Sequence, residues 1–139
     1  MDHTAQKMTR LSALCGAAAV IVGAFGAHAL KNTFELHQLD TVRLLGIYEK
    51  GVQYHFYHAL ALGLTALLAA RNPDSKWLPR AGGLFFAGIL FFSGSLYILA
   101  CRDLLSFSVA WIGPVTPLGG LCFIGGWVCL LISTRENGG

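Results

Sequence analysis

Long apolar runs separated by short polar stretches form the main pattern of this sequence. Two of these runs, Leu11–Leu30 and Ala81–Cys101, contain no Asp, Glu, Lys or Arg. About 20 apolar residues in a helix are enough to cross a hydrocarbon core of roughly 30 Å. The pattern therefore predicts a membrane-spanning helix in each of these two runs.

Two more apolar runs have a similar length. One extends from about residue 52 to residue 70 and is followed by Arg71 and the Asn72-Pro73 pair, which is typical of a helix stop. The other extends from about residue 117 to residue 133. We therefore predict an all-α, polytopic membrane protein: a single domain, residues 1–139, built as a bundle of four transmembrane helices.

The second and fourth helices are preceded by residues that favour helix caps. Asp40 comes directly before a helix that we expect to begin at Thr41, and an Asp side chain is a good N-cap acceptor. For the fourth helix we expect Thr116 as N-cap and Pro117 at the first helical position, where a missing N–H is harmless. The stretch from Leu104 to Val115 is apolar but broken, and we expect a bent or interfacial lead-in there.

Apolar residues also recur at helical spacing just before the second span, opposite Arg43 and Lys50. An amphipathic stretch of this kind is typical of a helix that lies on a membrane surface. The sequence therefore predicts an interfacial helical segment ahead of helix two, with Val42, Leu45, Tyr48 and Val52 as its apolar positions.

Four spans place both termini on the same side of the membrane. Cytoplasmic loops carry an excess of Lys and Arg, and six basic residues fall on the side of the termini against four on the other. We therefore expect cytoplasmic termini in a multi-pass protein of a bacterial plasma (inner) membrane. The six are Lys7, Arg10, Arg71, Lys76, Arg80 and Arg135, and the four are Lys31, Arg43, Lys50 and Arg102.

A cleaved signal peptide is the alternative reading of the first apolar run, because Ala27-His28-Ala29 resembles a cleavage site. The length of the apolar run and the further spans that follow it favour an uncleaved first helix.

Composition supports the membrane interpretation and excludes some classes of partner. Apolar residues make up 55% of the chain and charged residues 12%, whereas a soluble domain has about 25% charged residues. The net charge of +3 is not gathered in a basic cluster, so nucleic acid is not an expected partner. The four cysteines lack CxxC spacing and are expected to be buried apolar residues; they are Cys15, Cys101, Cys122 and Cys129.

Alternating helix direction brings polar residues of all four helices to one membrane face. The end of helix one, the start of helix two, the end of helix three and the start of helix four meet there. Polar groups at membrane depth normally face the bundle, so we expect them to converge. The residues are His28, Gln53, Tyr54, His55, Tyr57, His58, Ser93, Ser95, Tyr97 and Thr116.

Three interpretations of this polar cluster compete. The first is structural, in which neutral histidines and hydroxyl groups link helices. The second is a metal or haem site on His55, His58 and His28, although no acidic residue within the spans completes a ligand shell. The third is a proton-sensitive or solute-conducting site, because histidine titrates near neutral pH. We favour the structural interpretation and therefore expect no metal and no cofactor.

No catalytic arrangement is visible in the sequence. A nucleophile, base and acid do not occur together, and neither a phosphate loop nor HExxH is present. Glu49 is the one acid expected near the cluster, where it approaches His28 or Gln53. All seven acids are expected in tails or connections: Asp2, Glu35, Asp40, Glu49, Asp74, Asp103 and Glu136.

Glycines occur throughout the predicted helices. Lipid is as apolar as leucine, so helices in a bilayer associate through close backbone approach, which glycine permits. We expect helix packing at Gly23, Gly26, Gly88, Gly94, Gly119 and Gly120.

Four segments in order resemble a known family. They are "GAFGAHALK" (23–31), "QYHFYHALAL" (53–62), "GILFFSGSLYILA" (88–100) and "GPVTPLGGLCFIGGW" (113–127). The chain resembles the small membrane-protein family called domain of unknown function 423 and is similar to transmembrane protein 256. The resemblance implies several membrane helices and brings no activity, substrate or cofactor. The matching positions are Gly26, His28, Gln53, His58, Ser93, Gly94, Thr116, Pro117, Gly119, Gly120 and Trp127.

These observations favour a small binding or scaffolding bundle over an enzyme. The expected partners are the lipid bilayer and either a second copy of the chain or other membrane proteins. The alternative is an oligomeric transporter or channel, for a small solute or linked to protons, that uses the cluster of His28 and His58.

Overall fold

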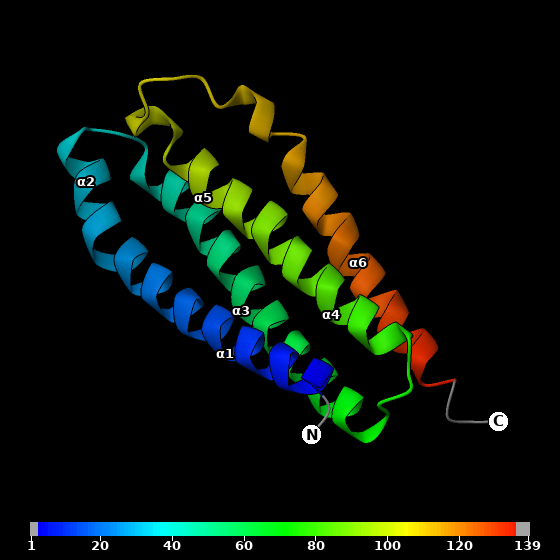
Figure 1. Cartoon of the computed structure of the whole chain (residues 1–139). Helices are drawn as coiled ribbons and strands as arrows, with labels where there is room; N and C mark the ends of the chain where they lie inside the picture. The colour runs from blue at the N-terminus through cyan, green and yellow to red at the C-terminus, as the bar shows by residue number, and fades with distance from the viewer. Residues whose placement is uncertain (1–2, 136–139) are drawn as a thin grey trace.

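A computed structural model describes residues 3–135. The first rod is continuous from residue 3 to residue 36: α1 (His3–Phe25), a π-helical segment (Gly26–Leu30) and α2 (Lys31–Leu36). After a short turn, α3 (Thr41–Arg71) runs back along it. Figure 1 shows the two rods side by side on the left of the bundle.

The second half of the chain repeats this antiparallel arrangement. α4 (Trp77–Gly88), a π-helical segment (Ile89–Ser93) and α5 (Gly94–Ala100) form one rod. Two 3-10 turns, Arg102–Leu104 and Ala110–Ile112, lie in the long connection to α6 (Val115–Ser133). The described residues contain helices and turns and no β-strand, which confirms the all-α fold class.

α3 lies at the centre of the row of helices. It packs against α1 on one side and against α4 and α5 on the other, and α6 packs against α4 and the second π-helical segment. The larger core cluster includes Leu62 of α3, Phe85 of α4 and Phe123 of α6. A smaller one, around Phe34, Leu44 and Tyr48, lies where α2, the start of α3 and the end of α5 meet.

The predicted helix start agrees with the structure in α3 but not in α6, whereas the predicted ends agree in both. Asp40 caps α3, because its carboxylate accepts a hydrogen bond of 3.2 Å from the backbone N–H of Arg43, and α3 stops at Arg71 as expected. The prediction for Thr116 was wrong. α6 already begins at Val115, with Pro114 at the N-cap position and no side-chain cap, so Thr116 lies within the first turn and its hydroxyl group contacts Ser95 of α5.

The interfacial segment expected before the second span is not a separate element. Residues 41–51 are the first three turns of α3 and continue into the apolar part without a break. Leu44 and Tyr48 of this stretch are buried against the rest of the protein, whereas Val42 is 86% exposed. That these turns lie on a membrane surface stays a prediction.

The exterior of the bundle is strongly apolar. Leu14, Ile21, Leu67, Leu121 and Ile124 are each more than 60% exposed, and contiguous apolar surface on this scale is unusual for a protein in water. Three helical stretches among the described residues are long and apolar enough to cross a membrane: 3–36, 77–100 and 110–133. α3 has 31 residues and is long enough, but the polar residues between 53 and 58 make it less apolar.

Glycines permit close helix contacts at only some of the predicted positions. A Cβ at Gly119 would collide with the backbone of Phe92, at Gly88 with the ring of Phe123, and at Gly26 with the ring of Tyr48. Gly23 allows a tighter than usual approach of Val52, and Gly120 leaves only ordinary contact with Phe92. A Cβ at Gly94 would meet no atom within 4 Å, so this glycine makes no close helix contact within the chain.

Gly119→Ala tests the closest of these contacts. The added methyl group meets the backbone of Phe92, which cannot move away as a flexible side chain would, so we expect a loss of about 1–3 kcal/mol in stability. Gly120→Ala is the matched control, because its Cβ would meet only the Phe92 ring at 3.8 Å. The measurement is unfolding in mixed micelles followed by circular dichroism. Equal stability of the two variants would contradict a backbone contact at Gly119.

Candidate functional site

The predicted polar cluster divides into three groups, and each group joins a different pair of helices. His58 and Tyr54 contact α6, His55 contacts α5, and Ser95 contacts the start of α6. Three predicted members lie outside these groups, and one of them is Tyr57, which is 56% exposed on α3. His28 is exposed on the first π-helical segment, and exposed Gln53 accepts a hydrogen bond from the Lys50 ammonium group at 3.2 Å.

His58 is the histidine of the site with the lowest exposed fraction. It is 5% exposed, and its Nδ1 lies 2.8 Å from the carbonyl oxygen of Tyr54, one turn earlier in α3. Its Nε2 accepts a hydrogen bond of 3.3 Å from the indole N–H of Trp127 in α6. Since Nε2 accepts, the proton lies on Nδ1 and is donated to Tyr54, which describes a neutral imidazole with both nitrogens engaged.

Aromatic rings surround the same imidazole. The His58 ring stacks on Phe123 of α6 with centroids 3.5 Å apart and an interplanar angle of 10°. Phe85 of α4 and Tyr54 complete the surroundings at 5.7 and 5.9 Å. The contacts therefore join three helices through one side chain, and they combine apolar packing with two hydrogen bonds.

His55 points to a different side of α3. Its Nδ1 lies 3.0 Å from the hydroxyl oxygen of Tyr97 in α5, and its ring lies beside the backbone of Cys15 in α1. The Tyr97 ring is 5.0 Å from that of Tyr48, whose hydroxyl group donates to the carbonyl oxygen of Val22 at 2.7 Å. This second group therefore links α1, α3 and α5.

The third group is a pair of hydroxyl groups. Ser95 Oγ and Thr116 Oγ1 are 2.6 Å apart, and Ser95 also donates to the carbonyl oxygen of Phe92. Nearby, Ser93 is fully buried at the end of the π-helical segment, and its Oγ has no hydrogen-bond partner among the described residues. A helical serine can donate to the carbonyl four residues earlier, which here is that of Ile89, the acceptor of the Gly94 N–H in the π-helical segment.

The three histidines considered as metal ligands do not form a ligand set. His55 faces α1 and α5, His58 faces α6, and His28 is exposed. Within residues 3–135, no three His, Cys, Asp or Glu side chains lie close enough together to hold a metal ion. The separation follows from the different directions of residues 55 and 58 around α3.

The positions of the acids differ partly from the expectation. Glu35 and Glu49 lie on helices α2 and α3 rather than in connections, and Asp2 and Glu136 lie outside the described residues. Glu49 lines a surface hollow together with Gln53, as expected, and Gly26 and Ala27 of the first rod form its other side.

Sequence reasoning missed three aromatic partners of His58: Phe85, Phe123 and Trp127. One signal was available, because a tryptophan in the middle of an apolar span needs an acceptor for its indole N–H. Such an acceptor has to come from a polar side chain of another helix, and His58 is one of these side chains. The missed glycines Gly51 and Gly63 contact Tyr97 and Ser12.

The apolar exterior, the long apolar helices and the polar contacts held between helices define a helical membrane protein. A family model described as "Protein of unknown function (DUF423)" matches residues 22–120, and the chain belongs to this family. The resemblance seen in the four sequence segments is thereby confirmed.

Relatives of similar length carry the name UPF0382 membrane protein. YwdK of Bacillus subtilis (strain 168) is 40% identical over 123 residues, which cover 88% of this chain and 91% of that protein. SH2409 of Staphylococcus haemolyticus (strain JCSC1435) is 40% identical over 125 residues, with 89% and 91% covered. SAB0533 of Staphylococcus aureus (strain bovine RF122 / ET3-1) is 40% identical over 130 residues, with 93% and 95% covered. No solved structure matches the chain.

Replacing His58 tests the role of its contacts. His58→Ala removes the stack on Phe123 and leaves the Trp127 N–H without its acceptor, so we expect a loss of about 3 kcal/mol in stability. His28→Ala is the control, because His28 is exposed and should be replaceable with little effect. Unfolding in mixed micelles measures both variants. A His58→Ala protein as stable as the His28→Ala protein would contradict a structural role for the enclosed imidazole.

Proposed function

We propose that the chain is a membrane-embedded binding or scaffolding bundle that associates with a second copy of itself. It crosses the bilayer four times, with its termini on the cytoplasmic side of a bacterial inner membrane, and its polar groups serve the packing of its own helices. It has no catalytic role. The single observation that carries this proposal is a wide apolar groove on the outer face of α1 and α3.

The groove has a volume of about 570 Å³ and lies between the two rods of the first half. Small residues of the first rod form one side of it: Ala19 is buried and Gly23 lies against Val52 of α3, whereas Ala24 and Ala27 are exposed. Such residues let another helix approach closely, which is the main source of helix association in a bilayer. The complete lining is Ala19, Val20, Gly23, Ala24, Ala27, Val52, Gln53, Phe56 and Tyr57.

A second copy of the chain is the occupant that fits this face best. Phe56 and Tyr57 form the other wall of the groove and are 38% and 56% exposed. A hollow and a projecting aromatic ridge therefore lie next to each other on one surface. A two-fold contact requires a surface that is complementary to itself, and the ridge of one copy can enter the groove of the other.

The engaged state of the histidines supports a structural role for them. Both nitrogens of His58 are hydrogen-bonded within the protein, and its ring is stacked on Phe123. The alternative, an oligomeric transporter or channel that uses His28 and His58, has less support, because opening a path at His58 would break these contacts.

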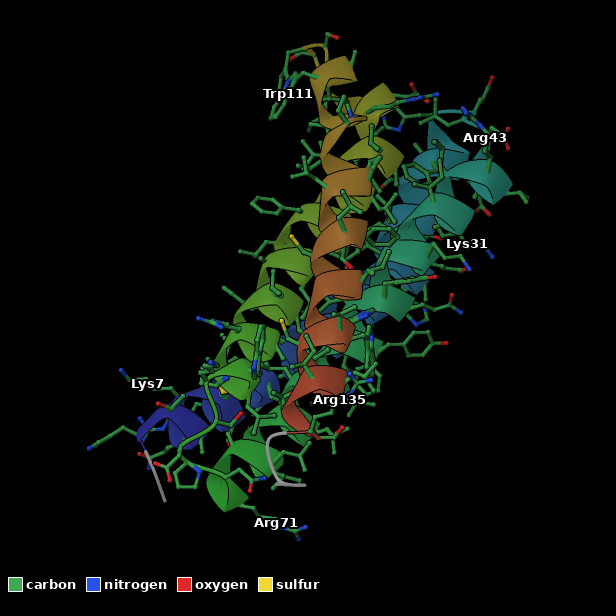
Figure 2. All side chains as sticks on the ribbon, turned by 90° about the vertical axis from the view of Figure 1, so that its right-hand side faces the viewer. Lys7, Lys31, Arg43, Arg71, Trp111 and Arg135 are labelled. Carbon is green, nitrogen blue, oxygen red and sulfur yellow. The ribbon has the colours of Figure 1, made fainter. Side chains whose placement is uncertain are left out.

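Four crossings are supported by the distribution of charged residues between the two ends. In Figure 2, Lys7, Arg71 and Arg135 lie toward one end of the bundle, and Lys31, Arg43 and Trp111 toward the other. If α3 did not cross, Arg43 and Arg71 would lie on the same side of the membrane. In the middle of α3, His55 and His58 are buried against neighbouring helices and do not oppose a crossing, whereas Gln53 and Tyr57 are exposed.

Cysteine labelling tests the four crossings. In a variant without native cysteines, we expect Gln38→Cys and Ser106→Cys to react with an impermeant maleimide added outside cells. Asp74→Cys should react only after the membrane is opened, because residue 74 lies on the side of the termini. Labelling of residue 74 from outside, or of 38 and 106 on opposite sides, would contradict the proposed topology.

Filling the groove tests self-association. Ala27→Trp places a large ring in the groove, and we expect it to reduce crosslinked dimers in membranes at least tenfold. Ala29→Trp is the matched control, because Ala29 is exposed on the same rod but does not line the groove. The readout is crosslinking in native membranes, with helicity as a check on folding. A wild-type chain that remains monomeric in membranes would remove the proposal, as would equal effects of the two tryptophans.

A further inference from the structure

The two ends of the bundle differ in how their charges are compensated. At the end of the α2–α3 turn and the long connection, four cations and four carboxylates lie together: Lys31, Arg43, Lys50 and Arg102 with Glu35, Asp40, Glu49 and Asp103. Three ion pairs form there, Lys31–Glu35 at 4.0 Å, Arg43–Asp40 at 3.4 Å and Arg102–Asp103 at 3.4 Å. This end is therefore close to electrically neutral.

The other end, called the basic end below, carries uncompensated positive charge. Its six cations are Lys7, Arg10, Arg71, Lys76, Arg80 and Arg135. Among the described residues Asp74 is the one carboxylate at this end, and none of the six cations takes part in an ion pair. Arg80 lies over the ring of Trp77 at 5.0 Å. Unpaired cations at a membrane surface attract anionic lipids, by about 1 kcal/mol for each Lys or Arg.

A second groove of about 260 Å³ opens at the basic end, between α1 and α4. Thr4, Lys7 and Met8 belong to its α1 wall, and Pro79 and Gly83 to its α4 wall. Buried Leu62 of α3 forms the floor. The lining extends from Thr4 to Leu11 and from Pro79 to Phe86, about 10 Å along each helix at 1.5 Å per residue, so it continues from the headgroup level into the hydrocarbon.

Gly83 keeps this groove open. A Cβ at this position would meet no atom within 4 Å, and the residue is exposed. Its neighbour Gly82 serves a different purpose, since a Cβ there would collide with the end of the Met8 side chain. A side chain longer than alanine at Gly83 would therefore project into the groove without disturbing the contact of α4 with α1.

We propose that this groove binds an anionic phospholipid, with one acyl chain against Leu62 and Gly83 and the phosphate against Lys7. An apolar channel that ends at an unpaired ammonium group is complementary to a lipid tail joined to a phosphate. The uncompensated cations of the basic end favour an anionic headgroup over a zwitterionic one. The inference goes beyond the proposed self-association and uses a different face of the molecule. It requires only that the basic end lies at the headgroups.

The test uses the full chain, purified in detergent and freed of lipid. Dioleoylphosphatidylglycerol and dioleoylphosphatidylcholine are titrated separately, and native mass spectrometry gives the dissociation constant of the first bound molecule. We expect phosphatidylglycerol to bind at least fivefold more tightly. Inorganic phosphate should not displace it, because the acyl chain contributes to binding. Equal affinity for the two lipids, or displacement by phosphate alone, would overturn the proposal.

Two variants locate the site. Lys7→Gln should weaken phosphatidylglycerol binding about fivefold, which corresponds to about 1 kcal/mol, and should weaken phosphatidylcholine binding less, because the choline group offsets the charge of its phosphate. Lys50→Gln is the control, since it removes a cation from the neutral end and should change neither constant. Gly83→Leu should weaken both lipids by filling the groove. If Gly83→Leu does not fold, the phosphatidylglycerol dissociation constants of the two lysine variants are compared. Equal weakening by Lys7→Gln and Lys50→Gln would place the lipid elsewhere and overturn the proposal.

Discussion

Hydrocarbon provides no hydrogen-bond partners, so a helix that carries polar side chains at membrane depth has to direct them toward other helices. α3 carries both buried histidines of this bundle, and it has another rod on each side, as the α4–α5 rod also does. His55 bonds toward α5, while His58 bonds toward α6. The place of α3 inside the row therefore agrees with its own composition.

The same constraint explains why the contacts of His58 involve so many rings. A neutral imidazole buried near lipid needs both an acceptor and a donor, and it obtains them from the carbonyl of Tyr54 and the indole of Trp127. Trp127 is itself 47% exposed, so the indole presents one surface to the outside while its N–H points inward. One tryptophan thus separates the polar interior from the apolar exterior.

Much of the architecture could be predicted from hydrophobic pattern and caps. The apolar runs, the cap at Asp40 and the stop after Arg71 depend on local sequence, which is why they agree with the structure. The division of the polar cluster could not be predicted, because it depends on the rotation of each helix about its axis. Thr116 illustrates the difference: as a local signal it indicated a cap, but a hydroxyl group on another helix holds it at 2.6 Å. The π-helical segment that ends at Ser93 also changes the direction in which the following side chains point, and regular helical spacing does not predict this change.

The helices pair mainly with their neighbours along the chain. The most extensive contacts are those of α1 with α3 and of α4 with α6, so the bundle consists of two successive hairpins joined by a short turn at residues 72–76. Each hairpin contains its own close contacts, such as Ser12 with the carbonyl of Ala59 in the first and Gly119 with Phe92 in the second. During synthesis the first hairpin can therefore assemble before the second has left the ribosome. The later pairing of the hairpins then uses the α3 surface that bears His55 and His58, together with the contact of Met8 in α1 with Gly82 in α4.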